Sequence, residues 1–181
     1  MIILASSSVT RAKILEENEV AFRQISFEFD ESGADKSLTP ASYVFKIVQS
    51  KKDQFLKAYP NLKNLLFADS AVVCKGQILG KAKDEKDALR MLNLQSQSVT
   101  KIITAMIFIG ENFEFINVSR ASYKFSKFDQ SELEEYIKSN DWQGKAGAMM
   151  IEGFNKKYIV EQIGNESTAR GLNYEQLKAF L

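Results

Sequence analysis

Histidine is absent from this sequence of 181 residues, and cysteine occurs once, at Cys74. The absence of histidine excludes Ser-His-Asp and Cys-His catalytic triads and the usual histidine-based zinc sites. The single cysteine excludes an internal disulfide framework and a multi-cysteine zinc site, and it fits a reducing compartment. Any catalysis therefore has to use carboxylates, lysine, arginine, hydroxyl groups or a hard metal ion.

An excess of one charge and long apolar runs are lacking as well. The 24 Lys and Arg residues nearly balance the 23 Asp and Glu residues, for a net charge of +1. This gives no electrostatic reason to expect a long nucleic acid or an acidic membrane surface as the partner. No apolar run approaches the roughly 20 residues that cross a bilayer, and residues 1–5 are too short for a signal peptide. We therefore expect a cytoplasmic protein that binds neither nucleic acid nor membrane.

Apolar residues are plentiful, at 45% of the sequence, so a sizeable core is expected. The length predicts a single domain over residues 1–181, with one or two lobes. Strand-like and helical segments follow each other along the chain, which favours the α/β class, a mixed sheet with flanking helices. Strands are expected at 2–5, 22–29, 65–68, 78–79, 99–110, 113–125, 148–151 and 158–163, and helices at 40–59, 84–94 and 173–181 and after residues 8 and 129.

A serine turn, residues 6–8, separates the first expected strand from a helix that begins at Val9. Serine is a good helix N-cap, and the free N–H groups at a helix start bind anions. The turn is therefore either a phosphate cradle completed by Arg11 or an ordinary capped helix with a surface arginine. On the local pattern alone the capped helix is favoured, because the glycine-rich phosphate loop is absent.

Acidic and basic residues follow three other strand-like segments. Asp30 and Glu31 are either solvated turn residues or metal ligands. Asp69 directly follows the apolar run 65–68, and a tight turn is expected at Lys75-Gly76. Lys81 comes just after a second short apolar run, 78–79. Because ligand groups gather at strand ends in α/β sheets, a carboxylate and an ammonium there suit a metal-bound polyphosphate. Acids with lysine and arginine, and without histidine, favour metal-assisted phosphate chemistry over acyl transfer.

Several short motifs occur in a fixed order along essentially the whole chain. Each is weak alone, but together and at this spacing they resemble the Maf (septum-formation) family of nucleoside triphosphate pyrophosphatases. The motifs are L-A-S-S-S-V-T-R at 4–11, D-E-S at 30–32, the lysine at 51, A-D-S at 68–70, I-L-G-K at 78–81, K-A-G-A at 145–148, I-E-G at 151–153 and G-L at 171–172.

The resemblance implies a mixed α/β fold with two lobes around a nucleotide cleft, in a family that is often dimeric, so a homodimer is expected as one option. It also implies hydrolysis of a nucleoside triphosphate to the monophosphate and pyrophosphate with a divalent metal, Mg²⁺ or Mn²⁺, as a house-cleaning reaction on the nucleotide pool. Asp69 is then the catalytic carboxylate, and Glu31 and Asp69 hold the metal. The implied phosphate ligands are Ser6, Ser8, Arg11, Lys51, Lys81 and Lys145.

The sequence departs from the family motifs at three positions where members with different base preferences differ. Thr10 replaces an arginine, Ser70 a threonine and Glu152 a glutamine. Ionised glutamate only accepts hydrogen bonds, whereas glutamine also donates. Glu152 therefore suits a base edge rich in N–H donors, such as guanine. The branch of the family that acts on 7-methyl-GTP also has glutamate at this position, so the resemblance favours 7-methyl-GTP over dTTP or UTP. A dTTP/UTP pyrophosphatase remains the alternative.

A second alternative is a weakly catalytic, nucleotide-binding regulator of cell division. The loss of arginine at Thr10 supports it. The presence of Glu31, Lys51, Asp69 and Lys81 opposes it, because a mere binder needs no carboxylate beside a triphosphate. Elsewhere, Cys74 is expected in the core, and Trp142 is expected to be structural rather than stacked on a base.

Overall fold

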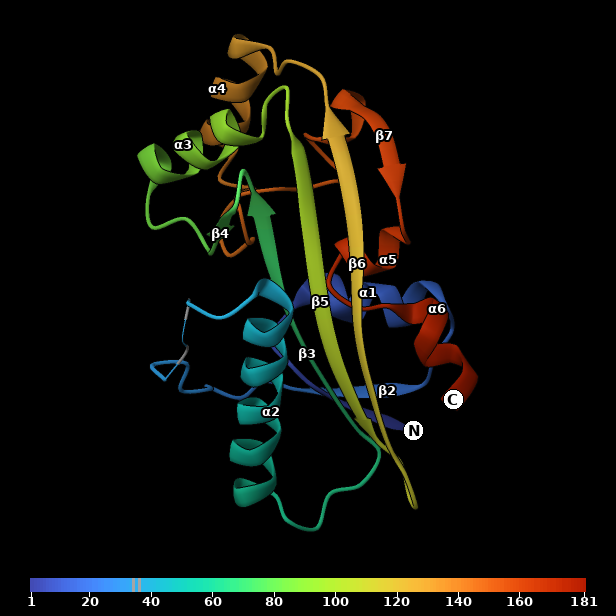
Figure 1. Ribbon diagram of the computed structural model, residues 1–181. Coiled ribbons are helices and arrows are strands. Elements are labelled where there is room, and N and C mark those ends of the chain that lie inside the picture. Colours follow the sequence, from blue (N-terminus) through green and yellow to red (C-terminus); the bar gives the residue numbers. More distant parts are fainter. Residues whose placement is uncertain (34, 36) are drawn as a thin grey trace. The chain divides into compact units, whose positions relative to one another are not determined.

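The computed structural model describes residues 1–33, 35 and 37–181 and has a seven-stranded mixed sheet with flanking helices (Figure 1). This confirms the predicted fold class. The strands are β1 (Ile2–Ala5), β2 (Phe22–Ile25), β3 (Leu65–Cys74), β4 (Gln77–Leu79), β5 (Val99–Ile109), β6 (Glu114–Phe125) and β7 (Ile159–Ile163). The α-helices are α1 (Val9–Glu17), α2 (Pro40–Ala58), α3 (Glu85–Gln95), α4 (Gln130–Ser139), α5 (Glu166–Ala169) and α6 (Tyr174–Leu177). Short 3₁₀ turns follow at Lys156–Tyr158 and Lys178–Phe180.

The strand order is β2-β1-β3-β5-β6-β7, with β4 paired to β3. β1 is parallel to both β2 and β3, whereas β4 is antiparallel to β3 and β7 is antiparallel to β6. β5 and β6 run in opposite directions as a hairpin (Figure 1). None of the helices in the described ranges combines the length and the apolar character that a membrane span requires.

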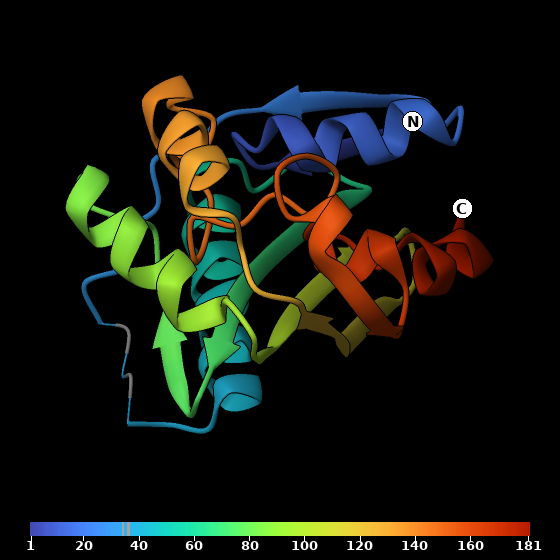
Figure 2. The same cartoon turned by 90° about the horizontal axis from the view of Figure 1, so that it is seen from above.

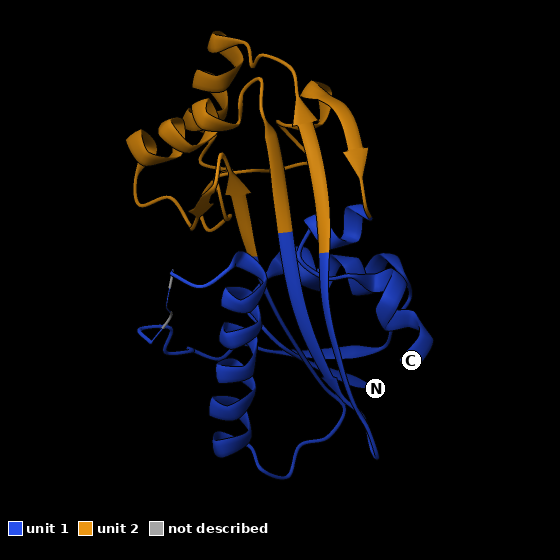
Figure 3. Ribbon diagram, viewed as in Figure 1, with its two compact units in different colours: residues 1–70, 103–119, 165–181 blue, residues 71–102, 120–164 orange. Residues whose placement is uncertain are grey.

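The chain divides into two compact units (Figure 3). Unit 1 comprises residues 1–70, 103–119 and 165–181, and unit 2 comprises residues 71–102 and 120–164. The division falls inside β3, β5 and β6, so each of these strands contributes residues to both units. A single domain over 1–181 therefore stays a prediction.

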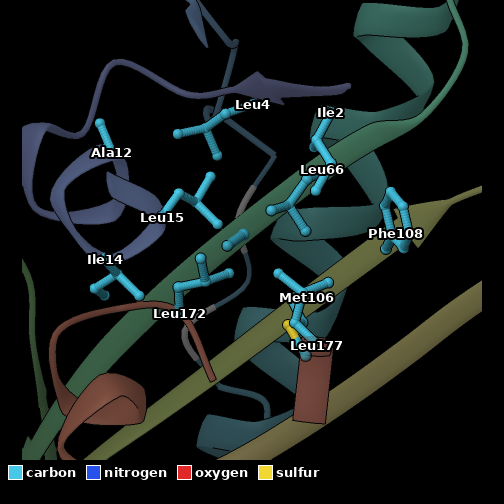
Figure 4. Close-up of a cluster of buried hydrophobic side chains, with 11 residues drawn as sticks. Ile2, Leu4, Ala12, Ile14, Leu15, Leu66, Met106, Phe108, Leu172 and Leu177 are labelled. Atoms are coloured by element: carbon cyan, nitrogen blue, oxygen red, sulfur yellow. The ribbon is translucent and has the colours of Figure 1, made fainter. Parts of the chain in front are cut away.

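The core of unit 1 forms around the short strand β1, whose four residues are all buried. A strand with neighbours on both sides and helices on its faces is expected to be continuously apolar. Helix α1 adds Ala12, Ile14 and Leu15 to this core, and Leu172 and Leu177 come from the C-terminal segment (Figure 4). Burial of these side chains fixes where β1 ends and α1 begins, and therefore where the serine turn lies.

Unit 2 is built around α3 and α4, which lie side by side (Figure 2), and a group of aromatic rings. Tyr136 and Phe154 stack at a centroid distance of 4.6 Å. Trp142 is 3% exposed, and its indole N–H donates to the carbonyl of Ile137 at 2.9 Å. Cys74 is buried, in agreement with the expected core position. Burial of Trp142 supports its structural interpretation.

Helix starts and the first hairpin follow the local sequence signals. Ser8, Thr39, Asp84 and Asp129 each cap a helix through a side-chain oxygen, which satisfies N–H groups that lack a partner inside the helix. Lys75 (φ 48°) and Gly76 (φ 77°) form the two-residue turn between β3 and β4. Positive φ at both positions is the conformation that matches the twist of a tight hairpin.

Two expected strands are wrong in part or entirely. The strand expected at 22–29 ends at Ile25, because β1, its neighbour within the described part of the chain, ends at the paired residue Ala5. Residues 148–151 form turns and irregular backbone instead of a strand, because Gly147 (φ 65°) and Ala148 (φ 53°) adopt the left-handed conformation, which a ladder cannot accommodate. The helix expected at 173–181 is shorter than predicted, since the α-helix ends at Leu177 and a 3₁₀ turn follows.

Candidate functional site

Arg11 is held by three acceptors in unit 1. Its Nη1 donates to Ser6 Oγ at 3.1 Å, its Nε to the carbonyl of Gly171 at 2.8 Å, and its Nη2 to Ser70 Oγ at 3.4 Å. Burial lowers the pKa of Arg11, and the carboxylates of Asp69 and Glu31 oppose that shift. Arginine stays protonated in proteins, so the site keeps a fixed, oriented positive charge. The expectation of an ordinary capped helix with a surface arginine is therefore wrong for Arg11.

The serine turn beside Arg11 is both a helix cap and a polar cradle. Ser8 Oγ accepts from the backbone N–H of Arg11 at 3.3 Å, and Ser6 Oγ accepts from the backbone N–H of Ser8 at 3.2 Å. Gln24 of the parallel strand β2 donates to the carbonyl of Ser6 at 2.7 Å. Gln24 was not expected to take part, because only the pairing of β1 with β2 brings it to the turn.

Arg11 and its three acceptors, on Ser6, Ser70 and Gly171, form what we call the Arg11 clamp, and a side chain at Gly171 would be strained. The φ of Gly171 is +102°, and an added Cβ would lie 3.3 Å from Ser70 Oγ and 3.4 Å from Arg11 Nε. Glycine adopts this backbone conformation freely, whereas other residues are strained there. The late G-L motif therefore serves to place a carbonyl against Arg11.

Asp69 interrupts an otherwise buried strand. β3 has four buried residues, then the half-buried pair Asp69 and Ser70, then four more buried residues. The expectation that Asp69 lies at a strand end is therefore wrong, because the ladder continues to Cys74 and only the side-chain environment changes.

Lys51 binds two carboxylates from different segments of unit 1. Its Nζ lies 2.7 Å from Asp69 Oδ1 and 2.8 Å from Glu31 Oε1, and its side chain is only 11% exposed. Lys51 is thus not an ordinary surface lysine of α2. Asp30, in contrast, is exposed and accepts from the backbone N–H of Ser32, which makes it a turn residue.

Tyr43, two turns before Lys51 on α2, belongs to the same environment. Its phenol is half-buried, and burial, followed by the charges of Asp69 and Glu31, raises its pKa. Its position in an apolar helical stripe gave no signal beyond core packing. Tyr43 therefore stays neutral at physiological pH and is available as a hydrogen-bond donor beside the two carboxylates.

The fit of this carboxylate pair to a divalent cation follows from its donor set. Glu31 and Asp69 converge on one cation position, which the Lys51 ammonium takes. Among the described residues there is no group of three or more Asp, Glu, Cys or His side chains that could hold a metal alone. Mg²⁺ in phosphate enzymes commonly binds one or two carboxylates together with substrate oxygens. Glu31 and Asp69 fit such a site, completed by the substrate.

In unit 2, the structure brings the segments of Lys81 and Lys145 together. Lys81 forms a β-bridge with Ala146, and the N–H of Gly147 donates to the carbonyl of Gly80 at 2.8 Å. The buried Gln95 donates to the carbonyl of Gly147 at 2.7 Å. An added Cβ at Gly147 would lie 2.8 Å from Val72, so glycine is required for this close approach.

Glu152 also belongs to unit 2, and its Oε1 lies 4.0 Å from Lys145 Nζ. Both side chains are about one quarter exposed, which leaves them accessible to a ligand. The expected site residues thus form two groups: the first in unit 1, the second in unit 2. The expected pairing of Asp69 with Lys81 stays a prediction, since the two belong to different units. The first group is Ser6, Ser8, Thr10, Arg11, Glu31, Lys51, Asp69 and Ser70, and the second is Lys81, Lys145 and Glu152.

Comparison with known proteins agrees with the motifs along the full length. The family model described as "Maf-like protein" matches residues 1–181. A protein of Campylobacter jejuni named nucleoside triphosphate pyrophosphatase is 43% identical over 185 residues, covering all of both chains. A Nitratiruptor protein of the same name is 41% identical, covering 98% of this chain and 96% of that one. A Helicobacter pylori protein, again of that name, is 32% identical, covering 97% and 92%.

Proposed function

Since the chain belongs to the Maf-like protein family, we propose that it is a nucleoside triphosphate pyrophosphatase, a hydrolase of acid anhydrides. Water attacks the α-phosphorus, a new P–O bond forms, and the bond to the bridging oxygen of the β-phosphate breaks. The products are a nucleoside monophosphate and pyrophosphate. The observation that carries the proposal is the Lys51 ammonium between the carboxylates of Asp69 and Glu31.

Attack of water builds negative charge on the phosphate oxygens, which fixed cations stabilise. We assign this role in unit 1 to Arg11 and Lys51, with the hydroxyl groups of Ser6 and Ser8 as further donors. Lys81 and Lys145 are the proposed phosphate ligands of unit 2. Arg11 is already oriented by its three acceptors, so it loses little freedom when an anion binds.

Asp69 is the proposed proton acceptor for the attacking water. A half-buried carboxylate can orient a water molecule and take its proton as the new bond forms. Glu31 and Asp69 would also hold Mg²⁺ or Mn²⁺, which when bound neutralises phosphate charge. Lys51 binds the same two carboxylates and is the proposed donor to the phosphate oxygens.

We further propose that the substrate is a modified guanine nucleotide such as 7-methyl-GTP, cleared from the nucleotide pool. Glu152 carries this assignment, because its carboxylate accepts hydrogen bonds from the N–H groups of guanine and cannot donate to a pyrimidine carbonyl. Its accessible side chain in unit 2 supports the role. Thr10 and Ser70 are the other proposed specificity positions, and dTTP or UTP is the competing substrate.

Measuring pyrophosphate release from a panel of nucleotides, with Mg²⁺ and with Mn²⁺, tests both the proposed reaction and the proposed base. We expect the wild type to release pyrophosphate fastest from 7-methyl-GTP. Glu152→Gln should lower kcat/KM for 7-methyl-GTP by about 10- to 100-fold, the value of one hydrogen bond to a charged group, and narrow or reverse the preference over dTTP and UTP.

Glu161→Gln is the matched control, since Glu161 is an exposed glutamate of β7 in the same unit. A wild type that clearly prefers dTTP would overturn the assignment of the base but not of the reaction. A wild type that binds a nucleotide yet releases no pyrophosphate from any of them would favour the regulator of cell division instead.

A further inference from the structure

Thr104 lies at the end of a chain of hydrogen bonds that leads to Arg11. It is fully buried in β5, and its Oγ1 is 2.7 Å from the carbonyl oxygen of Thr168. The same Oγ1 is 2.8 Å from Ser70 Oγ, which in turn accepts from Arg11 Nη2 at 3.4 Å. All four residues belong to unit 1.

Proton counting sets the direction of this chain. The carbonyl of Thr168 can only accept, so the single hydroxyl proton of Thr104 is used there. Between the two hydroxyl groups, Ser70 must then be the donor and Thr104 the acceptor. The lone pairs of Ser70 are left to face Arg11, whose guanidinium can only donate.

The carbonyl of Thr168 also anchors the other side of the clamp. It accepts from the backbone N–H of Gly171 at 3.1 Å, and the carbonyl of Gly171 accepts from Arg11 Nε. Thr104 and Gly171 therefore both donate to the carbonyl of Thr168. Thr104 positions the Ser70 hydroxyl, and Gly171 supplies its own carbonyl, so each one is linked to an acceptor of Arg11. A change at Thr104 is transmitted to Arg11 through Ser70 and through the Thr168–Gly171 segment.

Arg11 carries five N–H groups, and the contacts to Ser6, Ser70 and Gly171 engage three of them. Among the described residues, this leaves one N–H on Nη1 and one on Nη2 for an anion. The N–H groups of a guanidinium form charge-assisted hydrogen bonds to phosphate oxygens. The clamp thus sets which edge of the guanidinium faces the ligand.

We propose that Thr104 is a positioning residue that orients Arg11 toward the phosphates through the hydroxyl of Ser70. Ser70 then influences substrate choice through Arg11 and does not donate to the base, because its proton is committed to Thr104. This inference rests on the proposed function only for the identity of the anion that Arg11 binds.

Thr104→Val tests the proposal, because valine keeps the shape of threonine and removes the hydroxyl. We expect the Kd for inorganic pyrophosphate, measured by calorimetry, and the KM for the nucleotide each to rise about tenfold, with a smaller change in kcat. Thr104→Ser should restore both values. Thr100→Val is the control, since Thr100 is a buried threonine of the same strand whose hydroxyl has no partner among the described residues.

A nuclear magnetic resonance signal supplies a readout that does not depend on turnover. The Nε–H of Arg11 should be slow to exchange in the wild type, and Arg11→Lys identifies its signal by removing it. In Thr104→Val this signal should broaden or exchange faster, and Ser70→Ala should have the same effect if Thr104→Val fails to fold. An unchanged signal with unchanged pyrophosphate affinity in either folded variant overturns the inference.

Failure of the proposed function gives a different result. A wild type without nucleotide turnover, but with the expected changes in the Arg11 signal and in pyrophosphate affinity, would refute the pyrophosphatase and leave the positioning role intact. Equal losses in Thr104→Ser and Thr104→Val would overturn the role of the hydroxyl, since serine retains it.

Discussion

Asp69→Asn should lower the rate of pyrophosphate release by about 10²- to 10⁴-fold, the usual contribution of a general base. Asparagine keeps the size of the side chain but neither carries charge nor takes the proton of the attacking water. It also leaves Lys51 with Glu31 as its one anionic partner in the described part of the chain. Steady-state kcat with Mg²⁺ measures the effect, and nucleotide binding by calorimetry shows whether the variant still forms the complex.

Asp53→Asn provides the matched control for that experiment. Asp53 is an exposed carboxylate on α2, two residues from Lys51, so its replacement makes the same change in net charge. Its activity should equal that of the wild type. Full activity in Asp69→Asn would remove Asp69 from the mechanism.

Lys51→Met should have two effects of opposite sign. Turnover should fall about 10²- to 10³-fold, as when one donor to a developing charge is removed. The affinity of the nucleotide-free protein for Mn²⁺ should rise about tenfold, because an ammonium no longer competes for Glu31 and Asp69. One charge-assisted hydrogen bond, worth about 1.5 kcal/mol, accounts for a change of that size. Electron paramagnetic resonance of free Mn²⁺ measures it without any substrate.

Lys52→Met separates this effect from a general loss of positive charge. Lys52 is the next residue of α2, and its ammonium lies 3.1 Å from Glu114 instead of the candidate site. It should leave both turnover and Mn²⁺ affinity unchanged. An Mn²⁺ affinity that falls in Lys51→Met would show that Glu31 and Asp69 do not share one cation position.

Local chemistry was enough to predict much of the fold. Serine, threonine and aspartate caps marked the starts of four helices, and Lys75-Gly76 marked the first hairpin. Strand ends were harder to predict. β2 ends at Ile25 because its neighbour β1 ends at the paired residue, and the alternating phenylalanines after Ile25 do not indicate this end. The left-handed residues at Gly147 and Ala148 likewise depend on contacts with distant segments.

In the candidate site, likewise, the sequence was enough to identify residues but not their contacts. Motif order identified Arg11, Lys51 and Asp69, but not what each one touches. Arg11 is 160 residues away from Gly171 in the sequence, and only the fold places that carbonyl against it. Thr104 had no local signal at all, because a threonine in a buried strand is equally well explained by β propensity.

The positions of Cys74 and Trp142 give the protein a pair of built-in optical and chemical reporters. Each is the only residue of its kind in the sequence, and both are buried in unit 2. Indole fluorescence and the rate of thiol labelling therefore follow the opening of unit 2 alone. Loss of helical circular dichroism follows both units, since α1 and α2 belong to unit 1 and α3 and α4 to unit 2. Comparing these signals during unfolding distinguishes one cooperative transition from two, without any mutation.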